Sequence, residues 1–328
     1  MRHGSLRHVQ IRYELRLPFV ERTLMARTKK WSVVLMALLA AVFVFALLPT
    51  QALAKTGWYE EKYDDGWSDW FYYGKNGKPV KGWQKISGKW YYFDKEGGWL
   101  YDNGSFLIDG KNYVFSKSGA LVDKAGWQKF TYSYGSETWT NWFYTNSSGV
   151  ADTGWKKISG SWYYFWPDWG DMAHDGWIQD GGKYYAFGKN GAMLTNAWYQ
   201  ASVYDETNDG YAIGWLYFGS NGAAVKGWQK SGGSWYYMDA AKGAVPFMVS
   251  DTFKKIGGKT YYFNKSGAMA TGWKKIGSAY YYFNSDGTMV TKKWVGNYYL
   301  KEDGTMAVSE WIDGKYHVNK NGKWDKTK

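Results

Sequence analysis

A single pattern of aromatic and polar positions repeats along the chain from about residue 56 to its end. Its clearest copies read GWQKISGKWYYF from Gly82, GWKKISGSWYYF from Gly154, GWQKSGGSWYYM from Gly227 and GWKKIGSAYYYF from Gly272. Each copy holds two short aromatic or β-branched runs around a central polar pair, which predicts a β-hairpin with a two-residue turn. A period of about 20–30 residues indicates a repeat array, in which each unit buries its faces against its neighbours.

The first of these copies can be assigned a register. With Ser87-Gly88 at the turn, Trp83 lies opposite Tyr92, and Trp90 lies two positions further along the same face. Paired residues share a face and side chains alternate along a strand, so the two Trp and Tyr92 are predicted on one face. The residues predicted on the opposite face, which we expect to be the packing face, are Ile86, Tyr91 and Phe93.

The first aromatic of the pattern recurs twelve times. These positions are Trp58, Trp83, Phe106, Trp127, Trp155, Trp177, Trp198, Trp228, Phe253, Trp273, Trp294 and Trp311. Units one, four and seven have enlarged hairpin loops, at residues 59–69, 128–141 and 199–214, whereas units three, six and nine lack one or both Trp. The array is therefore predicted to consist of triplets of a long, a full and a degenerate hairpin, ending in a shorter terminal cap.

Composition supports a repetitive β-fold. The 328 residues include 23 Trp, 30 Tyr and 41 Gly, with only five Pro and no Cys. Abundant Gly and aromatic residues with little Pro favour many short strands and tight turns. The lack of Cys excludes disulfides and Cys-based metal sites. The expected fold class is all-β, a solenoid of stacked β-hairpin repeats.

The N-terminal residues are predicted to lie outside this fold. Residues 25–54 carry a basic start, an apolar stretch of 18 residues and a final small-x-small sequence, which is the layout of a secretory signal peptide cleaved before Lys55. An uncleaved membrane anchor is the alternative. Residues 1–24 precede this complete signal and are interpreted as a mis-assigned upstream extension. Residues 55–328 then form the array of a secreted protein, located at the cell surface or in the cell wall.

Charge favours an anionic wall polymer over nucleic acid. The whole chain carries a formal charge of +12, but residues 1–54 hold eight of the Lys and Arg and two of the Asp and Glu, which leaves +6 for the repeats. This weak balance is spread along the array, and no basic run interrupts it. A diffuse positive charge suits an anionic polymer, and we expect no nucleic-acid partner.

Three aromatic side chains that converge without a paired carboxylate fit two kinds of ligand. One is a sugar ring stacked on Trp, and the other is a quaternary ammonium held by cation–π attraction. The alternative is that each Trp fills the core between hairpins. Leu, Val and Ile, which would build such a core more simply, are scarce in the repeats.

The Gly-Trp, Trp-Tyr-Tyr-Phe and Gly-Ala-Met cadence resembles the choline-binding, or cell-wall-binding, repeats of Gram-positive bacteria and their phages, over about residues 56–324. The resemblance implies a left-handed superhelix with about three hairpins per turn. It also implies that choline binds between consecutive hairpins, in a site lined by two Trp of one repeat, an aromatic of the next and often a Met.

Applied to this chain, the resemblance implies a set of aromatic cages. They are Trp83 and Trp90 with Tyr113; Trp127 and Trp142 with Tyr164; Trp155 and Trp162 with Tyr185; Trp198 and Trp215 with Tyr237; Trp228 and Trp235 with Tyr262; and Trp273 and Tyr280 with Tyr299. The residues at the family's Met position are Met172, Met193, Met269, Met289 and Met306. The degenerate units are expected to lack complete sites.

No catalytic or metal site is expected. The only His residues after the predicted signal peptide are His174 and His317, and Asp and Glu lie in turns typical of solvated residues. Metal-ligand spacings and a Gly-rich phosphate loop are also missing from the sequence. It therefore predicts a non-catalytic protein without a cofactor that binds choline-decorated teichoic or lipoteichoic acid or another wall polysaccharide. The alternative is a glucan- or host-glycan-binding adhesin. The enlarged loops either are tolerated insertions at hairpin tips or offer a second face to a protein or glycan partner.

Overall fold

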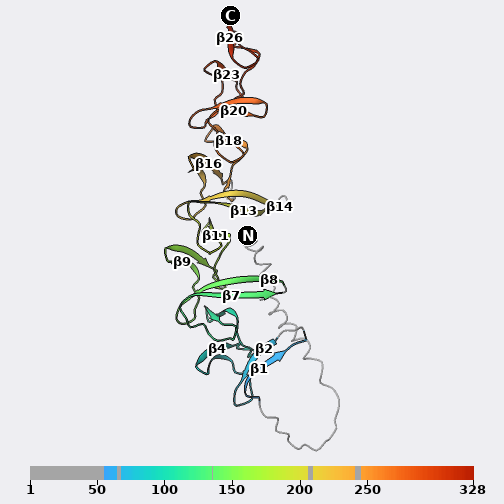
Figure 1. The fold of residues 1–328 in the computed structure, drawn as a ribbon, viewed down its shortest axis with the longest axis vertical. Helices are drawn as coiled ribbons and strands as arrows, with labels where there is room; N and C mark the ends of the chain where they lie inside the picture. Colours follow the sequence, from blue (N-terminus) through green and yellow to red (C-terminus); the bar gives the residue numbers. More distant parts are fainter. Residues whose placement is uncertain (1–54, 65–67, 135, 206–209, 241–244) are drawn as a thin grey trace, which may run out of the picture. The chain divides into compact units, whose positions relative to one another are not determined.

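The chain folds into a series of β-hairpins (Figure 1). The computed structural model describes residues 55–328 apart from 65–67, 135, 206–209 and 241–244. The predicted signal peptide and upstream extension lie outside these residues. In the described part, the chain forms twelve β-sheets of two or three strands each and no helix. The prediction of an all-β array of twelve hairpin repeats is confirmed.

The hairpins belong to two compact units. The first holds the described residues up to Trp177 together with Phe187–Met193, and the second holds Ile178–Ala186 and Leu194–Lys328. The strands of the first unit are β1 (Gly57–Lys62), β2 (Ser68–Tyr73), β3 (Gly82–Ile86), β4 (Lys89–Phe93), β5 (Gly104–Ile108), β6 (Lys111–Phe115), β7 (Gly126–Tyr134), β8 (Glu137–Thr145), β9 (Gly154–Ile158) and β10 (Ser161–Phe165). The strands β11 (Gly176–Asp180) and β12 (Lys183–Phe187) contain residues of both units.

The second unit continues the same order of paired strands. Its strands are β13 (Ala197–Asp205), β14 (Gly210–Phe218), β15 (Gly227–Ser231), β16 (Ser234–Asp239), β17 (Phe247–Met248), β18 (Thr252–Ile256), β19 (Lys259–Phe263), β20 (Gly272–Ile276), β21 (Ala279–Phe283), β22 (Lys293–Val295), β23 (Tyr298–Leu300), β24 (Glu310–Ile312), β25 (Tyr316–Val318) and β26 (Trp324–Thr327). The last sheet gains β26 as a third strand beside β25. This extra strand covers one edge of the final hairpin, as expected of a terminal cap.

The predicted register of the β3–β4 hairpin is confirmed. Trp83 pairs with Tyr92, and Lys85 pairs with Trp90. The turn residue Gly88 has a φ of +83°, and positive φ is what the tight two-residue turn of a twisted hairpin requires. The same register recurs in β9–β10 and β15–β16. The alternation of side chains therefore places both Trp of a full repeat on one face.

Each hairpin is bonded to the turn that follows the next hairpin. The amide of Leu100, after β4, donates to the carbonyl of Trp70 in β2 at 2.8 Å, and the amide of Leu121, after β6, donates to the carbonyl of Trp90 in β4 at 2.8 Å. Equivalent bonds join Met172 to Trp142, Met193 to Trp162, Met269 to Trp235, Met289 to Thr260 and Met306 to Tyr280. We call this contact the inter-hairpin hydrogen bond. It satisfies a carbonyl that a lone hairpin would leave to water.

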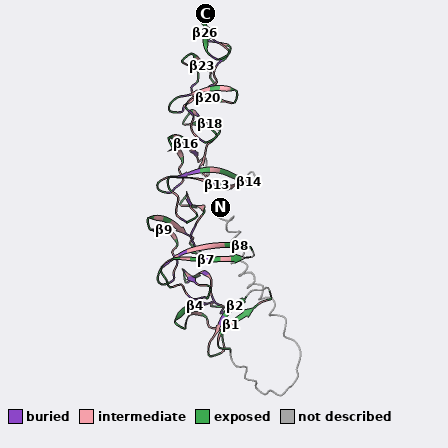
Figure 2. Ribbon diagram, in the orientation of Figure 1, coloured by how far each residue is buried: buried purple, intermediate pink, exposed green. Residues whose placement is uncertain are grey.

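The core is a series of Phe residues at the ends of the second strands. Figure 2 colours the ribbon by burial, with buried residues in purple. Phe93 is fully buried, and its backbone bridges to Leu100 in the following turn. The Phe93 ring lies 5.8 Å from the ring of Trp58 in the preceding hairpin. The equivalent buried residues are Phe115, Phe165, Phe187, Phe218, Phe263 and Phe283. The first Trp of a hairpin therefore packs on the Phe of the next one.

The expected packing face is confirmed, because the rings of Tyr91 and Phe93 lie 5.0 and 5.8 Å from that of Trp58 in the preceding hairpin. The opposite face is packed as well, since Tyr92, on the Trp83 face, is only 4% exposed. The reason is that a stacked hairpin has a neighbour on both faces.

Two of the enlarged hairpins have longer strands rather than longer loops. Strands β7 and β8 pair over nine positions, as do β13 and β14. In the β7–β8 extension Tyr132 stacks on Trp139 at 5.7 Å, and Tyr132 also packs on the cluster that contains Val114 and Phe143. This aromatic pair thus supports its own hairpin. The third enlarged hairpin belongs to the second unit, so the alignment of all three on one face stays a prediction.

Replacing a core Phe should loosen the array locally. We expect Phe165→Ala to lower the free energy of unfolding by about 3–5 kcal/mol, because the ring is fully buried and leaves a cavity. Hydrogen exchange measures the loss at β9–β10 and its neighbours, since a repeat array need not unfold in one step. Lys157→Ala, at an exposed position of β9, is the control. A loss below about 1 kcal/mol would contradict this account of the core.

Two glycines with positive φ form a matched pair. A Cβ on Gly88 would have nothing within 4 Å, whereas one on Gly119 would overlap the side chain of Leu100. We expect Gly88→Ala to cost about 1–2 kcal/mol, the usual cost of a left-handed conformation. Gly119→Ala should cost about 1–3 kcal/mol more, because Leu100 must also move. Urea denaturation compares the two variants, and equal losses would show that the Leu100 contact is unimportant.

Candidate functional site

Each full repeat presents two Trp rings at right angles. The rings of Trp83 and Trp90 in β3–β4 lie 6.3 Å apart at 87°. The same arrangement, at 6.2 to 6.5 Å, occurs in the pairs Trp127–Trp142, Trp155–Trp162 and Trp228–Trp235. Trp90 is 43% exposed, whereas Trp83 is half-buried because it packs on the next hairpin. The two rings form two walls of an open corner.

The next hairpin supplies a third wall. Tyr113 of β6 lies 4.9 Å from Trp83, as the sequence predicted. In four other cages the tyrosine in contact is one residue earlier than expected. The contacts observed are Tyr163 with Trp127 at 5.0 Å, Tyr236 with Trp198 at 4.9 Å, Tyr261 with Trp228 at 4.9 Å and Tyr298 with Trp273 at 5.3 Å. The residues expected in these places were Tyr164, Tyr237, Tyr262 and Tyr299.

The error of one residue has a simple cause. Tyr164 lies 5.3 Å from Trp155, the first Trp of its own hairpin, because the two residues pair across the strands. A shift of one position moves a side chain to the other face of a strand. Only the face toward the preceding hairpin can close that hairpin's cage, and Tyr163 lies on it. Tyr185, expected to close the Trp155 cage, belongs to the other compact unit, so that pairing stays a prediction.

Most of the predicted Met residues adjoin the second aromatic of a cage through the inter-hairpin hydrogen bond, a place that Leu121 takes beside Trp90. Met172 lies beside Trp142, and Met269 lies beside Trp235. Met193 and Met306 take the same place in the cages of Trp162 and Tyr280. Met289 is different, because it bonds to Thr260 in a degenerate hairpin that lacks the second aromatic wall. Four of the five predicted Met residues therefore adjoin an aromatic pair.

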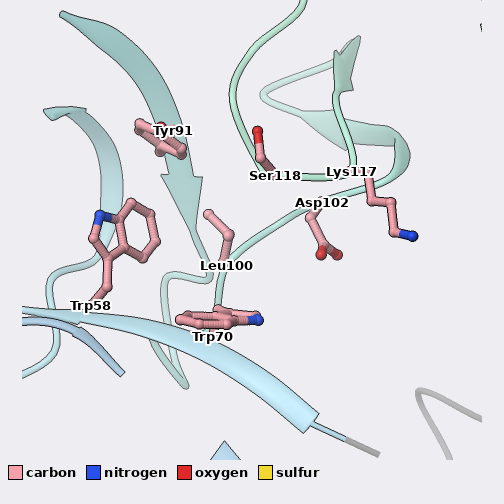
Figure 3. Close-up of a pocket in the computed structure, with 7 residues that line it drawn as sticks. All are labelled: Trp58, Trp70, Tyr91, Leu100, Asp102, Lys117 and Ser118. Carbon is pink, nitrogen blue, oxygen red and sulfur yellow. The ribbon is translucent and has the colours of Figure 1, made fainter. Parts of the chain in front are cut away.

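The structure adds a cage that the sequence analysis did not include. Trp58 and Trp70 of the first hairpin, Tyr91 of β4 and Leu100 line a hollow of about 340 Å³ (Figure 3). Tyr91 lies 5.0 Å from Trp58, which matches the third wall of the other cages. The long spacing between the two Trp hid this site, although Trp70 begins a Trp-Phe-Tyr-Tyr run that resembles the repeat cadence.

The degenerate hairpin β5–β6 has no aromatic corner. Phe106 pairs with Tyr113, so Ser105 and not Phe106 occupies the position of the first Trp. Asn112, at the position of the second Trp, is buried, and its amide donates a hydrogen bond of 3.0 Å to the carbonyl of Pro167. A fixed polar side chain therefore replaces the exposed ring. This agrees with the expectation that the degenerate units lack complete sites.

A lysine of the same hairpin lies over the second aromatic in several repeats. The Lys85 ammonium is 5.8 Å from the centroid of Trp90, which is its partner across the strands. Lys129, Lys230 and Lys275 lie over Trp142, Trp235 and Tyr280 at 5.6 to 5.9 Å. At these distances the ring attracts a cation. The outer wall of these cages thus has a π face that already attracts an ammonium group.

Several polar groups outside the cages have structural partners. Asp286 accepts hydrogen bonds from the Thr288 hydroxyl at 2.6 Å and from its amide at 3.0 Å, and these bonds lower the pKa of the Asp286 carboxyl. His317 Nδ1 lies 2.6 Å from Asp325 Oδ1. Among the residues that the structure describes, no group of three His, Asp or Glu could hold a metal ion. In the same residues, no helix is long and apolar enough to cross a membrane.

Comparison with known proteins identifies the repeats. Models of choline-binding repeats match residues 56–105, 80–125, 152–198, 207–253, 249–294 and 288–324. The structure is similar to that of CbpJ from Streptococcus pneumoniae, with 28% identity and a TM-score of 0.53, over 82% of this chain and all of that one. It is also similar to choline binding protein F from Streptococcus pneumoniae in the presence of a peptidoglycan analogue, with 29% identity and a TM-score of 0.53, over 83% of this chain and all of that one.

Glucosyltransferases of two further Streptococcus species also align with this chain. A glucosyltransferase-S of Streptococcus mutans is 30% identical over 167 residues, which are 50% of this chain and 10% of the enzyme. A glucosyltransferase-I of Streptococcus downei is 28% identical over 247 residues, 65% of this chain and 14% of the enzyme. The chain thus spans about a tenth of the first relative's length. Because the repeat models match most of the sequence, the chain belongs to the choline-binding repeat family.

Proposed function

We propose that this chain is a non-catalytic surface protein that attaches to the bacterial cell wall by binding the choline of teichoic or lipoteichoic acid. The observation that carries the proposal is the three-walled cage, such as Trp83 and Trp90 closed by Tyr113. Three π faces around one space attract a quaternary ammonium without needing a carboxylate. Cleavage of the predicted signal peptide would leave the array at the cell surface.

The geometry of the walls favours an ammonium group over a sugar. A sugar ring stacks on a broad flat ring and needs polar groups beside it to fix its orientation. The two Trp rings instead stand nearly perpendicular, so they surround a small rounded group. In several cages the outer ring also lies under a lysine ammonium. Glucan binding remains the second candidate, because the glucosyltransferase relatives align with these repeats.

Retention on the wall should come from many weak sites. Three cation–π contacts of about 1 kcal/mol each correspond to millimolar binding or weaker. Several cages on one chain that face one polymer raise the effective concentration for each further contact. The array therefore suits reversible but durable attachment. A non-catalytic role is supported by the repeats themselves, because their aromatic side chains stack or form cages. Acidic residues such as Asp286 are hydrogen-bonded within turns.

Free choline should release the protein from a quaternary-amine resin. We expect elution of the secreted chain at millimolar choline, because the free ligand competes for each cage. Sodium chloride at the same concentration should not elute it, since a cation–π cage depends little on ionic strength. A third elution uses dextran, a soluble glucan. Release by salt would show that charge holds the protein, and release by dextran but not choline would favour the glucan candidate.

Loss of one outer wall should remove one site. Trp235→Ala deletes the exposed ring of the cage formed with Trp228 and Tyr261, so calorimetry should show one choline fewer per chain. Thr260→Ala, at the same position of a degenerate hairpin, should leave the number of sites unchanged. If Trp235→Ala keeps every site and only lowers stability, the ring serves packing rather than binding.

A further inference from the structure

The long hairpin β13–β14 continues well beyond its own cage. The face that carries the outer cage wall continues along the extension as three cross-strand pairs, which are Gln200 with Trp215, Ser202 with Ile213 and Tyr204 with Tyr211. We call these six residues the strip. On β14, Ile213 is 67% exposed and Tyr211 is 56% exposed, beside Trp215 at 43%. Because side chains at alternate positions share a face, these three form one exposed apolar row that begins at the cage.

The opposite face of the same hairpin holds it in place. Ala201 of β13 and Leu216 of β14 are buried there. Between them, Gly214 lies so close to Phe247 of β17 that a Cβ would overlap the phenyl ring. The packing of the extension is therefore carried by this face. The apolar side chains of the strip are not needed to anchor it.

The other long hairpin shows that the strip positions can be polar. In β7–β8 the places of Ile213 and Tyr211 are taken by Thr140 and Thr138. The hydroxyls of these threonines lie 3.4 and 3.3 Å from the hydroxyls of their partners across the strands. Both hairpins pair over nine positions, so an extension of this length does not require apolar side chains on this face. Exposed apolar residues that the fold does not require indicate a contact surface.

The size of the strip limits what can cover it. It spans the six pairs from Gln200–Trp215 to the turn, which is about 20 Å at about 3.4 Å per residue. Two strands are about 10 Å wide, so the face measures about 200 Å². A stable protein interface covers about 800 Å² on each partner. The strip is therefore too small for a folded protein or a second copy of this chain, and its long, narrow form suits an extended polymer.

The chemistry of the strip favours an uncharged sugar chain. None of its six residues is charged. Its rings and the Ile213 side chain can cover the C–H faces of sugars, while the tyrosine hydroxyls, the Gln200 amide and the Ser202 hydroxyl can bond to sugar hydroxyls. Apolar surface with a few polar groups that fix orientation is typical of ligand sites. Since Trp215 belongs to both the cage and the strip, one polymer can contact both.

We propose that the strip binds uncharged sugar residues of the same wall polymer whose choline lies in the cage of Trp198 and Trp215. This inference rests on the proposed function and deepens it, because the cage recognises a substituent and the strip recognises the chain that carries it. The cage of Trp127 and Trp142 continues into the threonine face of β7–β8 and lacks this apolar row. The chain therefore contains its own comparison.

Fluorine NMR can observe the cage and the strip separately. The secreted chain is labelled with 5-fluorotryptophan in one sample and 3-fluorotyrosine in another, and the resonances of Trp215 and Tyr211 are assigned by their loss in Trp215→Phe and Tyr211→Phe. Free choline should shift Trp215 but not Tyr211, which lies four residues, about 13 Å, further along the strand. Short fragments of choline-decorated teichoic acid should shift both. At Trp215 they should bind about five- to tenfold more tightly than choline, the effect of burying about 50 Å² more apolar surface.

The double variant Tyr211→Thr/Ile213→Thr gives β14 the residues that β8 has at these positions. It should bind the fragments no more tightly than choline, and its choline affinity should be unchanged, which also shows that the hairpin is folded. Ala212→Ser, at an exposed position on the opposite face of β14, is the matched control and should keep the tighter binding.

Three results would overturn the proposal while the proposed function stands. One is a fragment that shifts Trp215 but not Tyr211. Another is tighter fragment binding that survives the double variant. The third is a Tyr211 resonance that moves with protein concentration in the absence of ligand, which would assign the strip to a second copy of the chain. If neither choline nor the fragments shift Trp215, choline binding in this cage fails, and the proposal fails with it.

Discussion

The inter-hairpin hydrogen bond is the contact on which the rest of the structure depends. A two-stranded hairpin is marginal in water by itself, and this bond fixes where the next hairpin lies. It brings the buried Phe of one hairpin against the first Trp of the one before, as Phe93 lies against Trp58. Its acceptor is the carbonyl of the residue that forms the outer wall, such as Trp70 or Trp90. The same peptide group therefore determines both how consecutive hairpins stack and where the outer wall of the cage lies.

The two Trp walls of a cage contribute unequally to ligand binding and to the stability of the stack. The first Trp is shared, because it packs on the next hairpin and also faces the cage, whereas the second is the more exposed ring, as Trp90 shows. The second position can therefore change without loss of the stack. Thr260 occupies it and still accepts the bond from Met289. Degenerate hairpins thus remain in the array as structural members.

The sequence predicts the structural features that depend on contacts within a single hairpin. The turn dipeptide and the alternation of side chains were enough to pair Trp83 with Tyr92 and to place both Trp on one face. The choice between Tyr163 and Tyr164 could not be made in this way, because both faces of the strand carry a Tyr and only contact with the preceding hairpin distinguishes them. The rim of the first cage was not predicted for the same reason, since Asp102 and Lys117 line it from turns that follow different hairpins.

Assembly of each cage from consecutive segments constrains how such a gene can lengthen or shorten. Duplication of one hairpin inserts a new set of neighbours and leaves distant cages unchanged. Only the cages that span the insertion point receive a wall and a turn from the inserted hairpin, so only they depend on its sequence. An array built in this way can therefore gain or lose hairpins one at a time while its other sites stay intact.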